Sequence, residues 1–173
     1  MDTMRDYDIA ANRFYGSLGL VSLPLTSWDF YAENLQKLSL LSEDLVLLTA
    51  LARKNGWVSL PEFHKKLVRD KYVIVVTDVN LEIVHATHNV LEMTGYFPRE
   101  IIGENPKMFQ GKDTSKRSSE KIGKAVRSQQ PFEAVVLNYK KDGSPYKCQI
   151  KGLPVYDHSG EVVNFIAYER KVA

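Results

Sequence analysis

The hydrophobic pattern of this chain changes period near residue 71, and that change restricts the fold more than any other feature. Before it, apolar residues recur every three or four positions, which is the spacing of a helix with one apolar face. After it, short runs rich in β-branched and aromatic residues alternate with turn residues, which favours strands. The sequence therefore predicts a helical extension over residues 1–70 and a domain over residues 71–173.

The domain is predicted to contain five strands in two groups. They cover residues 72–77, 83–86, 132–139, 146–155 and 162–170. Gly143 and Gly160 lie in predicted hairpin turns between the last three strands. Helices are expected between the two groups, over residues 89–94, 98–102 and 115–128. This order predicts an α+β domain whose five-stranded antiparallel sheet carries helices over one face, with room for a pocket between them.

The extension is predicted to hold three helices, which start at Thr26, Ser42 and Ser59. Each start is a hydroxyl residue followed within three positions by an acid, which suits the positive end of a helix. Gly56 fits the left-handed residue that commonly follows a helix. Residues 1–25 are irregular but apolar enough to pack on the rest. The first helix is expected to be anchored by its aromatic residues, Trp28, Phe30 and Tyr31.

Composition excludes several classes of protein. The chain has 173 residues, a formal net charge of +2 and one cysteine, Cys148, so it can form neither an internal disulfide nor a cysteine-based zinc cluster. The small net charge does not favour nucleic acid, and no apolar run approaches the roughly 20 residues of a membrane span. The N-terminus lacks the apolar core of a signal peptide, so we expect a cytoplasmic protein. No catalytic motif predicts an enzyme, and no output domain is expected after the last strand.

Several strings in residues 71–171 resemble the PAS domain family. Residues 105–111 read Asn-Pro-Lys-Met-Phe-Gln-Gly and are similar to Asn-Cys-Arg-Phe-Leu-Gln-Gly, the flavin-holding loop of the light-oxygen-voltage (LOV) branch. Four further strings are similar to family motifs in the same order: residues 89–96, 98–103, 137–143 and 165–169. The resemblance implies a PAS fold with an enclosed pocket. The photoreactive cysteine of the LOV loop corresponds to Pro106, which has no thiol, so the family's photoadduct is not expected.

The resemblance also implies a set of flavin contacts, of which this chain keeps part. Asn105, Gln110 and Asn138 are retained. The loop arginine that meets the flavin phosphate becomes Lys107, which keeps the charge but loses the two-pronged geometry.

The other implied contacts are lost. In the family, a second arginine that meets the flavin phosphate stands at the position of Gly123. Two side-chain amides that hydrogen-bond to the edge of the flavin correspond to Cys148 and Glu169 in this chain. An amide both donates and accepts hydrogen bonds, whereas an ionised carboxylate only accepts. The ligand is therefore left unknown, with FMN possible but disfavoured. The candidate residues lining the pocket are Asn105, Lys107, Gln110, Asn138, Cys148 and Glu169.

Four features have competing interpretations. Cys148 could be a reactive thiol, but a lone cysteine in a strand is more often a small core residue. Glu169 could bind a ligand cation or pair with a lysine at the sheet surface, because a slip of one residue exchanges the two faces. His85 and His88 indicate a metal pair only weakly. The basic stretch over residues 107–127 fits a solvated helix face better than a nucleic-acid site.

The sequence as a whole predicts a non-enzymatic sensory or signalling PAS module. It would bind a small ligand or a protein partner without cysteinyl-flavin photochemistry. The alternative is a cysteine-less flavin sensor of light or redox state, and a small enzyme or nucleic-acid binder is less favoured. The partner is predicted to be a signalling protein such as a histidine kinase. The helical extension is expected to support a homodimer.

Overall fold

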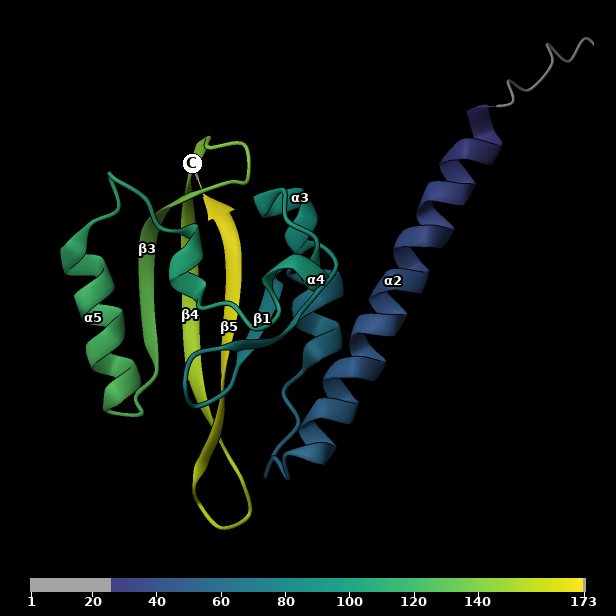
Figure 1. The fold of residues 1–173 in the computed structure, drawn as a ribbon. Helices are drawn as coiled ribbons and strands as arrows, with labels where there is room; N and C mark the ends of the chain where they lie inside the picture. Colours follow the sequence, from purple (N-terminus) through teal and green to yellow (C-terminus); the bar gives the residue numbers. More distant parts are fainter. Residues whose placement is uncertain (1–25, 173) are drawn as a thin grey trace, which may run out of the picture. The chain divides into compact units, whose positions relative to one another are not determined.

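The computed structural model describes residues 26–172 (Figure 1). The chain divides into two compact units, Met1–Ser39 and Leu40–Ala173. The described part of the first unit is the beginning of helix α2 (Thr26–Lys54). The predicted packing of residues 1–25 lies outside the described residues, and so do the side chains of the three aromatic anchors, Trp28, Phe30 and Tyr31.

Helix α2 runs through Ser42 without a break, so the prediction of a separate helix starting there was wrong. The sequence of α2 contains neither proline nor glycine, and nothing in it interrupts the backbone hydrogen bonds. The chain turns away at Gly56, whose φ of +63° is left-handed as expected. The third predicted helix is reduced to a short π-helical segment, η1 (Lys65–Arg69). No helix among residues 26–172 is long and apolar enough to cross a membrane.

The predicted five-stranded antiparallel sheet is confirmed. Its strands are β1 (Val73–Thr77), β2 (Ile83–Ala86), β3 (Phe132–Tyr139), β4 (Pro145–Tyr156) and β5 (Val162–Val172). They lie in the order β2-β1-β5-β4-β3, and all neighbouring pairs are antiparallel. The last strand therefore lies beside the first, and β5 joins the two strand groups of the sequence into one sheet.

Short helices cover one face of this sheet, which we call the inner face. They are α3 (Val90–Thr94), α4 (Pro98–Ile101), the 3-10 helix η2 (Pro106–Phe109) and α5 (Lys116–Arg127). Figure 1 shows α5 alongside β3, with α3 and α4 nearer β1. Val73 and Val75 of β1 point to this face and belong to the same buried core as Ile101 and Phe109.

The opposite, outer face of the sheet is covered near β1 by the second half of α2. Because side chains alternate along a strand, Ile74 and Val76 point away from the inner face. They pack in a second buried core with Leu48 and Ala52 of α2 and with Trp57. The part of α2 in the second unit is therefore a third layer of this unit, and the helical prediction for the extension is confirmed as far as residues 26–54.

A buried asparagine holds the end of α2 to the sheet. Asn164 on β5 is only 2% exposed. Its Oδ1 accepts hydrogen bonds from Trp57 Nε1 at 2.9 Å and from Asn55 Nδ2 at 2.7 Å. Its Nδ2 donates to the carbonyl oxygen of Thr77 at 2.9 Å. One side chain therefore satisfies polar groups from two segments, and each would otherwise be buried without a partner.

Replacing Asn164 by alanine is expected to lower the free energy of unfolding by about 2–4 kcal/mol, because the Trp57 indole N–H and the Thr77 carbonyl lose their partners. Urea denaturation measures this change. In the background of Trp57→Phe the same replacement should cost about 1 kcal/mol less, since the indole donor is already gone. Equal costs in the two backgrounds would show that the Trp57–Asn164 bond does not contribute.

Candidate ligand pocket

A cavity of about 130 Å³ lies between the inner face of the sheet and the segment formed by η2 and α5. Its walls are mainly apolar and include three aromatic rings, those of Phe109, Phe132 and Phe165. The Phe132 ring lies directly over Gly152, where an added Cβ would stand 2.2 Å from the ring. Seven polar or charged side chains also line the cavity: Thr77, Asn105, Lys107, Gln110, Ser119, Asn138 and Glu169.

The loop before α5 uses two of its amides to hold its own shape. The Asn105 side chain caps η2 and accepts a hydrogen bond from the backbone N–H of Lys107 at 3.0 Å. Gln110 Oε1 accepts from the Ser119 hydroxyl at 3.1 Å, which connects the loop to α5. Each amide oxygen therefore has a structural partner, while both residues also line the cavity.

The end of this loop is held against β3. The Tyr139 hydroxyl donates to Asp113 at 2.8 Å and accepts from the backbone N–H of the same residue at 3.1 Å. The Thr114 hydroxyl donates to the carbonyl oxygen of Leu137 at 2.6 Å. Gly111 is required here because a Cβ at this position would lie 2.4 Å from the Tyr139 ring. The glycine of the loop motif thus has a packing role in this chain.

At one end of the cavity lies a group of four side chains on the inner face, which we call the polar cluster: Asn138 and Glu169, which line the cavity, and Tyr146 and Cys148, which do not. All four are buried, with exposed fractions of 5% or less. The Cys148 thiol donates to Glu169 Oε2 at 3.6 Å, a weak contact. The Tyr146 hydroxyl is buried and makes no well-formed hydrogen bond among the described residues, although the Asn138 side chain lies close enough to lower its pKa in part.

Burial controls the protonation of the polar cluster. It raises the pKa of the Glu169 carboxyl from 4.5 to about 7, and the contact with Cys148 lowers this pKa only in part. Burial, together with the neighbouring carboxyl, raises the pKa of the Cys148 thiol far above its ordinary value. Burial likewise raises the pKa of the Tyr146 phenol. The cysteine is therefore a protonated thiol and a poor nucleophile, whereas the carboxyl titrates near neutral pH.

The structure places five of the six predicted pocket residues in the cavity wall: Asn105, Lys107, Gln110, Asn138 and Glu169. Cys148 is not part of the wall and lies against Glu169. It is wholly buried, as expected of a core residue. The alternative in which Glu169 pairs with a surface lysine was wrong, because β5 pairs it with Ile150 and Val73 on the inner face.

Sequence reasoning missed two hydroxyl groups. Thr77 and Tyr146 each bury an oxygen that makes no well-formed hydrogen bond within the described residues, and only the strand register shows that both face inward. Of the two histidines that indicated a metal only weakly, His88 instead places its Nδ1 2.8 Å from Asp44 Oδ1. Among residues 26–172, no group of three or more histidine, cysteine or acidic side chains could hold a metal.

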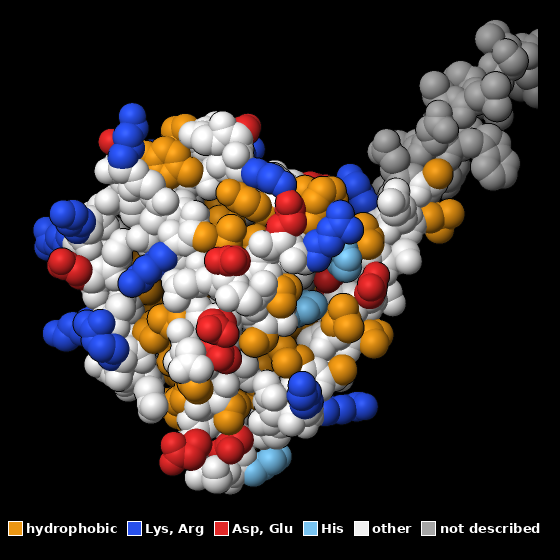
Figure 2. Space-filling view, in the orientation of Figure 1, with side chains coloured by type: hydrophobic (Ala, Val, Ile, Leu, Met, Phe, Trp, Pro, Cys, Tyr) orange, Lys and Arg blue, Asp and Glu red, His pale blue; other side chains and the backbone are white. Residues whose placement is uncertain are grey.

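The predicted basic stretch forms the outward side of α5. Figure 2 shows Lys and Arg side chains gathered on the left, over this helix. The exposed ones are Lys116, Arg117, Lys121, Lys124 and Arg127. Ile122, Gly123 and Val126 of the same helix face the cavity. This is an amphipathic helix whose charged side is solvated, as the sequence indicated.

Comparison with protein families matches residues 70–170, more than half of the chain, to the PAS domain. This chain belongs to the PAS domain family. A solved structure similar to this PAS chain is the dark structure of the blue-light photoreceptor Aureochrome1 LOV, with a TM-score of 0.60 and 29% identity. The match covers 66% of this chain and 86% of that one, so the predicted PAS fold and its LOV-like character are confirmed.

Three known proteins are similar to parts of this PAS chain. It is 37% identical over 91 residues to Phototropin-2 of Oryza sativa subsp. japonica, and 41% identical over 88 residues to Protein TWIN LOV 1 of Arabidopsis thaliana. It is 34% identical over 90 residues to a blue-light-activated histidine kinase of Brucella anthropi. These matches cover 53%, 50% and 52% of this chain but only 10%, 22% and 18% of the relatives.

The residues of this pocket do not fit flavin. A cavity of about 130 Å³ is well below the roughly 300–1,000 Å³ of pockets that enclose ligands of drug size. Glu169 adds a buried carboxyl and Cys148 a protonated thiol, while Gly123 offers no cation to a phosphate. Pro106 lines the cavity and has no group able to bond covalently to a ring.

Replacing Glu169 by glutamine is expected to stabilise the protein, increasingly so as the pH rises. The carboxyl ionises near pH 4.5 when unfolded and near pH 7 when folded. Between these values the folded state holds the additional proton, so stability falls as pH rises, and the loss is complete above the folded pKa. The amide does not titrate. The stability difference should therefore grow by about 2–3 kcal/mol from about pH 4.5 to about pH 8.

Urea denaturation of both proteins across this range measures the difference. Subtracting one curve from the other removes the titration of shared groups such as His85, whose pKa is lowered to about 4 by burial and by His88. Glu120→Gln, which removes an exposed carboxyl from α5, is the matched control and should not reproduce the growth expected at position 169. A constant difference for Glu169→Gln would contradict the buried carboxyl.

Proposed function

We propose that this chain is a sensory module that binds a small ligand in the pocket without cysteinyl-flavin photochemistry. The observation that carries the proposal is the cavity itself, whose mainly apolar walls include a few polar side chains, among them the buried Glu169. Such a combination is typical of a site that orients a small molecule. PAS domains are generally sensory rather than catalytic, and no nucleophile with a lowered pKa lies in this pocket among the described residues.

The route from the pocket to the helical layer runs through β1. Glu169 pairs with Val73, so a shift of the polar cluster moves β1 directly. The neighbouring residues Tyr72 and Ile74 are held by hydrogen bonds to the turn before α3. Asn89 Nδ2 donates to the Tyr72 carbonyl at 2.9 Å, and the Ile74 N–H donates to the Thr87 hydroxyl at 2.9 Å.

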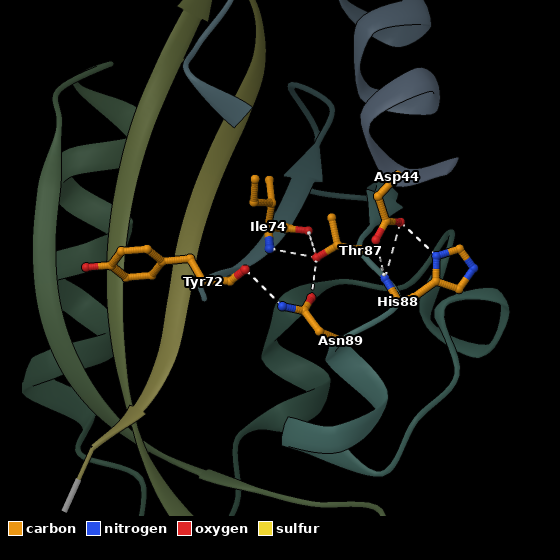
Figure 3. Close-up of polar contacts among 6 residues, drawn as sticks. All are labelled: Asp44, Tyr72, Ile74, Thr87, His88 and Asn89. Carbon is orange, nitrogen blue, oxygen red and sulfur yellow. Dashed lines mark hydrogen bonds and ion pairs between the residues drawn. The ribbon is translucent and has the colours of Figure 1, made fainter. Parts of the chain in front are cut away.

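The same turn reaches α2 (Figure 3). Asp44, only 1% exposed, accepts from the backbone N–H of His88 at 3.0 Å, and its Oδ1 lies 2.8 Å from His88 Nδ1. Burial raises the pKa of Asp44, while its bonds to His88 oppose this effect. The chain of contacts from Glu169 through β1 and the turn to Asp44 is continuous. We therefore propose that ligand binding changes how firmly residues 40–54 are held to the sheet.

The helical extension is proposed to deliver the signal to a partner. In this proposal residues 1–70 form the extension and residues 71–173 the sensor. Within the second unit, α2 exposes two apolar side chains, Val46 and Leu47. They offer a surface for a second copy or for a signalling protein, with a histidine kinase the favoured class. The relatives include a histidine kinase that carries such a domain. The proposed site of action is the cytoplasm.

The purified protein is expected to show no flavin absorption, before or after addition of FMN, because the cavity lacks the volume and the edge donors. Visible spectroscopy, together with mass spectrometry of whatever co-purifies, tests this. Glu169→Gln is the matched variant, since it restores an amide at the polar end, and any flavin affinity should appear there first. A yellow wild-type protein that bleaches under blue light would instead establish the cysteine-less flavin sensor.

Replacing Asp44 by alanine is expected to loosen α2 without opening the sheet, because the His88 N–H loses its acceptor. Hydrogen exchange should become roughly 5–50-fold faster for backbone amides of residues 45–54, corresponding to about 1–2 kcal/mol. Exchange in β3 and β4 should be unchanged. Glu43→Ala removes an exposed neighbouring acid and is the control. Equal effects of the two replacements would remove Asp44 from the proposed route.

A further inference from the structure

Among the described residues, the Glu169 carboxyl accepts only one hydrogen bond, and that bond is weak. Its carboxyl is 5% exposed and contacts the Cys148 thiol at 3.6 Å. No lysine or arginine of the described part pairs with it. A buried carboxylate normally receives strong hydrogen bonds or a cation, since without them its desolvation is costly. Because this carboxyl lines the cavity, the cavity is where its missing donor can be bound.

The walls around this acceptor suit an aromatic ring. Phe109, Phe132 and Phe165 line the cavity together with aliphatic side chains. Its volume of about 130 Å³ is close to that of the roughly 150 Å³ apolar cavity that is known to hold benzene. Aromatic side chains favour stacked or edge-to-face contact with a further ring. Size and lining together indicate a molecule with one aromatic ring, or little more.

We propose that the polar cluster is a subsite for an N–H donor and that the pocket binds a small aromatic molecule that carries an amine or azole N–H, which it directs to Glu169. This inference rests on the proposed function and assigns a ligand class to its pocket. Thr77 has a buried hydroxyl without a partner, but it lies four residues along β1 from Val73, the residue that pairs with Glu169. It therefore belongs to another part of the cavity.

A donor fits better than an acceptor for reasons of protonation. A ligand N–H stabilises the ionised carboxylate, so it binds more tightly as Glu169 loses its proton above about pH 7. A ligand carbonyl would need the protonated acid and would bind more tightly at low pH. Cys148 and Tyr146 are the titratable neighbours, and both stay protonated through this range because burial raises each pKa. β1 presents Val73 at the paired position, and α5 presents Ile122, Gly123 and Val126.

Aniline and toluene form a matched pair of probes, since they are similar in shape and differ in the N–H group. Binding to the full chain is measured by ligand-observed NMR at about pH 5.5 and about pH 8.5. We expect aniline to bind about tenfold more tightly than toluene at the higher pH, and the preference to shrink at the lower pH. Glu169→Gln should keep a small preference that no longer depends on pH. Glu120→Gln, on the exposed side of α5 and outside the cavity wall, should behave as wild type.

Four outcomes would overturn the inference. Equal binding of both probes at the higher pH would leave a ligand pocket but remove the donor subsite, so the proposed function would survive alone. A preference that persists unchanged in Glu169→Gln would place the contact elsewhere. Failure of both probes to bind a folded protein, with folding confirmed by circular dichroism, would reject the ligand class together with the aromatic fit. Benzaldehyde, bound more tightly at the lower pH, would reverse the assignment to an acceptor ligand.

Discussion

All five residues of β1 are buried, and the rest of the structure depends on this double burial. A strand with one polar face needs only one core, whereas β1 supplies alternate side chains to two cores at once. The inner core holds the short helices and the pocket, and the outer core holds α2 and Trp57. The strand also pairs with β2 on one side and β5 on the other. A displacement of β1 therefore cannot be confined to one layer.

The polar residues of the pocket differ in whether hydrogen bonds within the protein explain their presence. The side-chain oxygens of Asn105 and Gln110 accept hydrogen bonds that hold the loop, so the two residues are at least partly structural. Glu169 makes no comparable hydrogen bond to the loop. Its burial destabilises the folded state near neutral pH, and buried groups that destabilise the fold without holding it together are commonly found at functional sites. This contrast separates Glu169 from the other candidates.

Much of the fold followed from local pattern, because each prediction concerned residues close in sequence. The span of β3 was predicted without error, and Gly56 adopts the expected left-handed conformation. Ser42 was misread because a helix start signal is also compatible with a helix interior when no breaking residue precedes it. Asp44 and His88 lie 44 positions apart, and no local signal could join them. The face occupied by Glu169 depends on strand register, which a shift of one residue reverses.

The contact between Phe132 and Gly152 constrains how this pocket can change over evolution. Any side chain at position 152 would meet the Phe132 ring, so a mutation there is tolerated only after the ring has been replaced by something smaller. The reverse order passes through a protein with a severe clash. Larger cavities are therefore reached first through position 132, and the two sites form an epistatic pair. In a library that varies the two positions independently, variants with a new side chain at position 152 and the original Phe132 would be lost through this clash. The same change at position 152 becomes acceptable once position 132 carries a smaller residue.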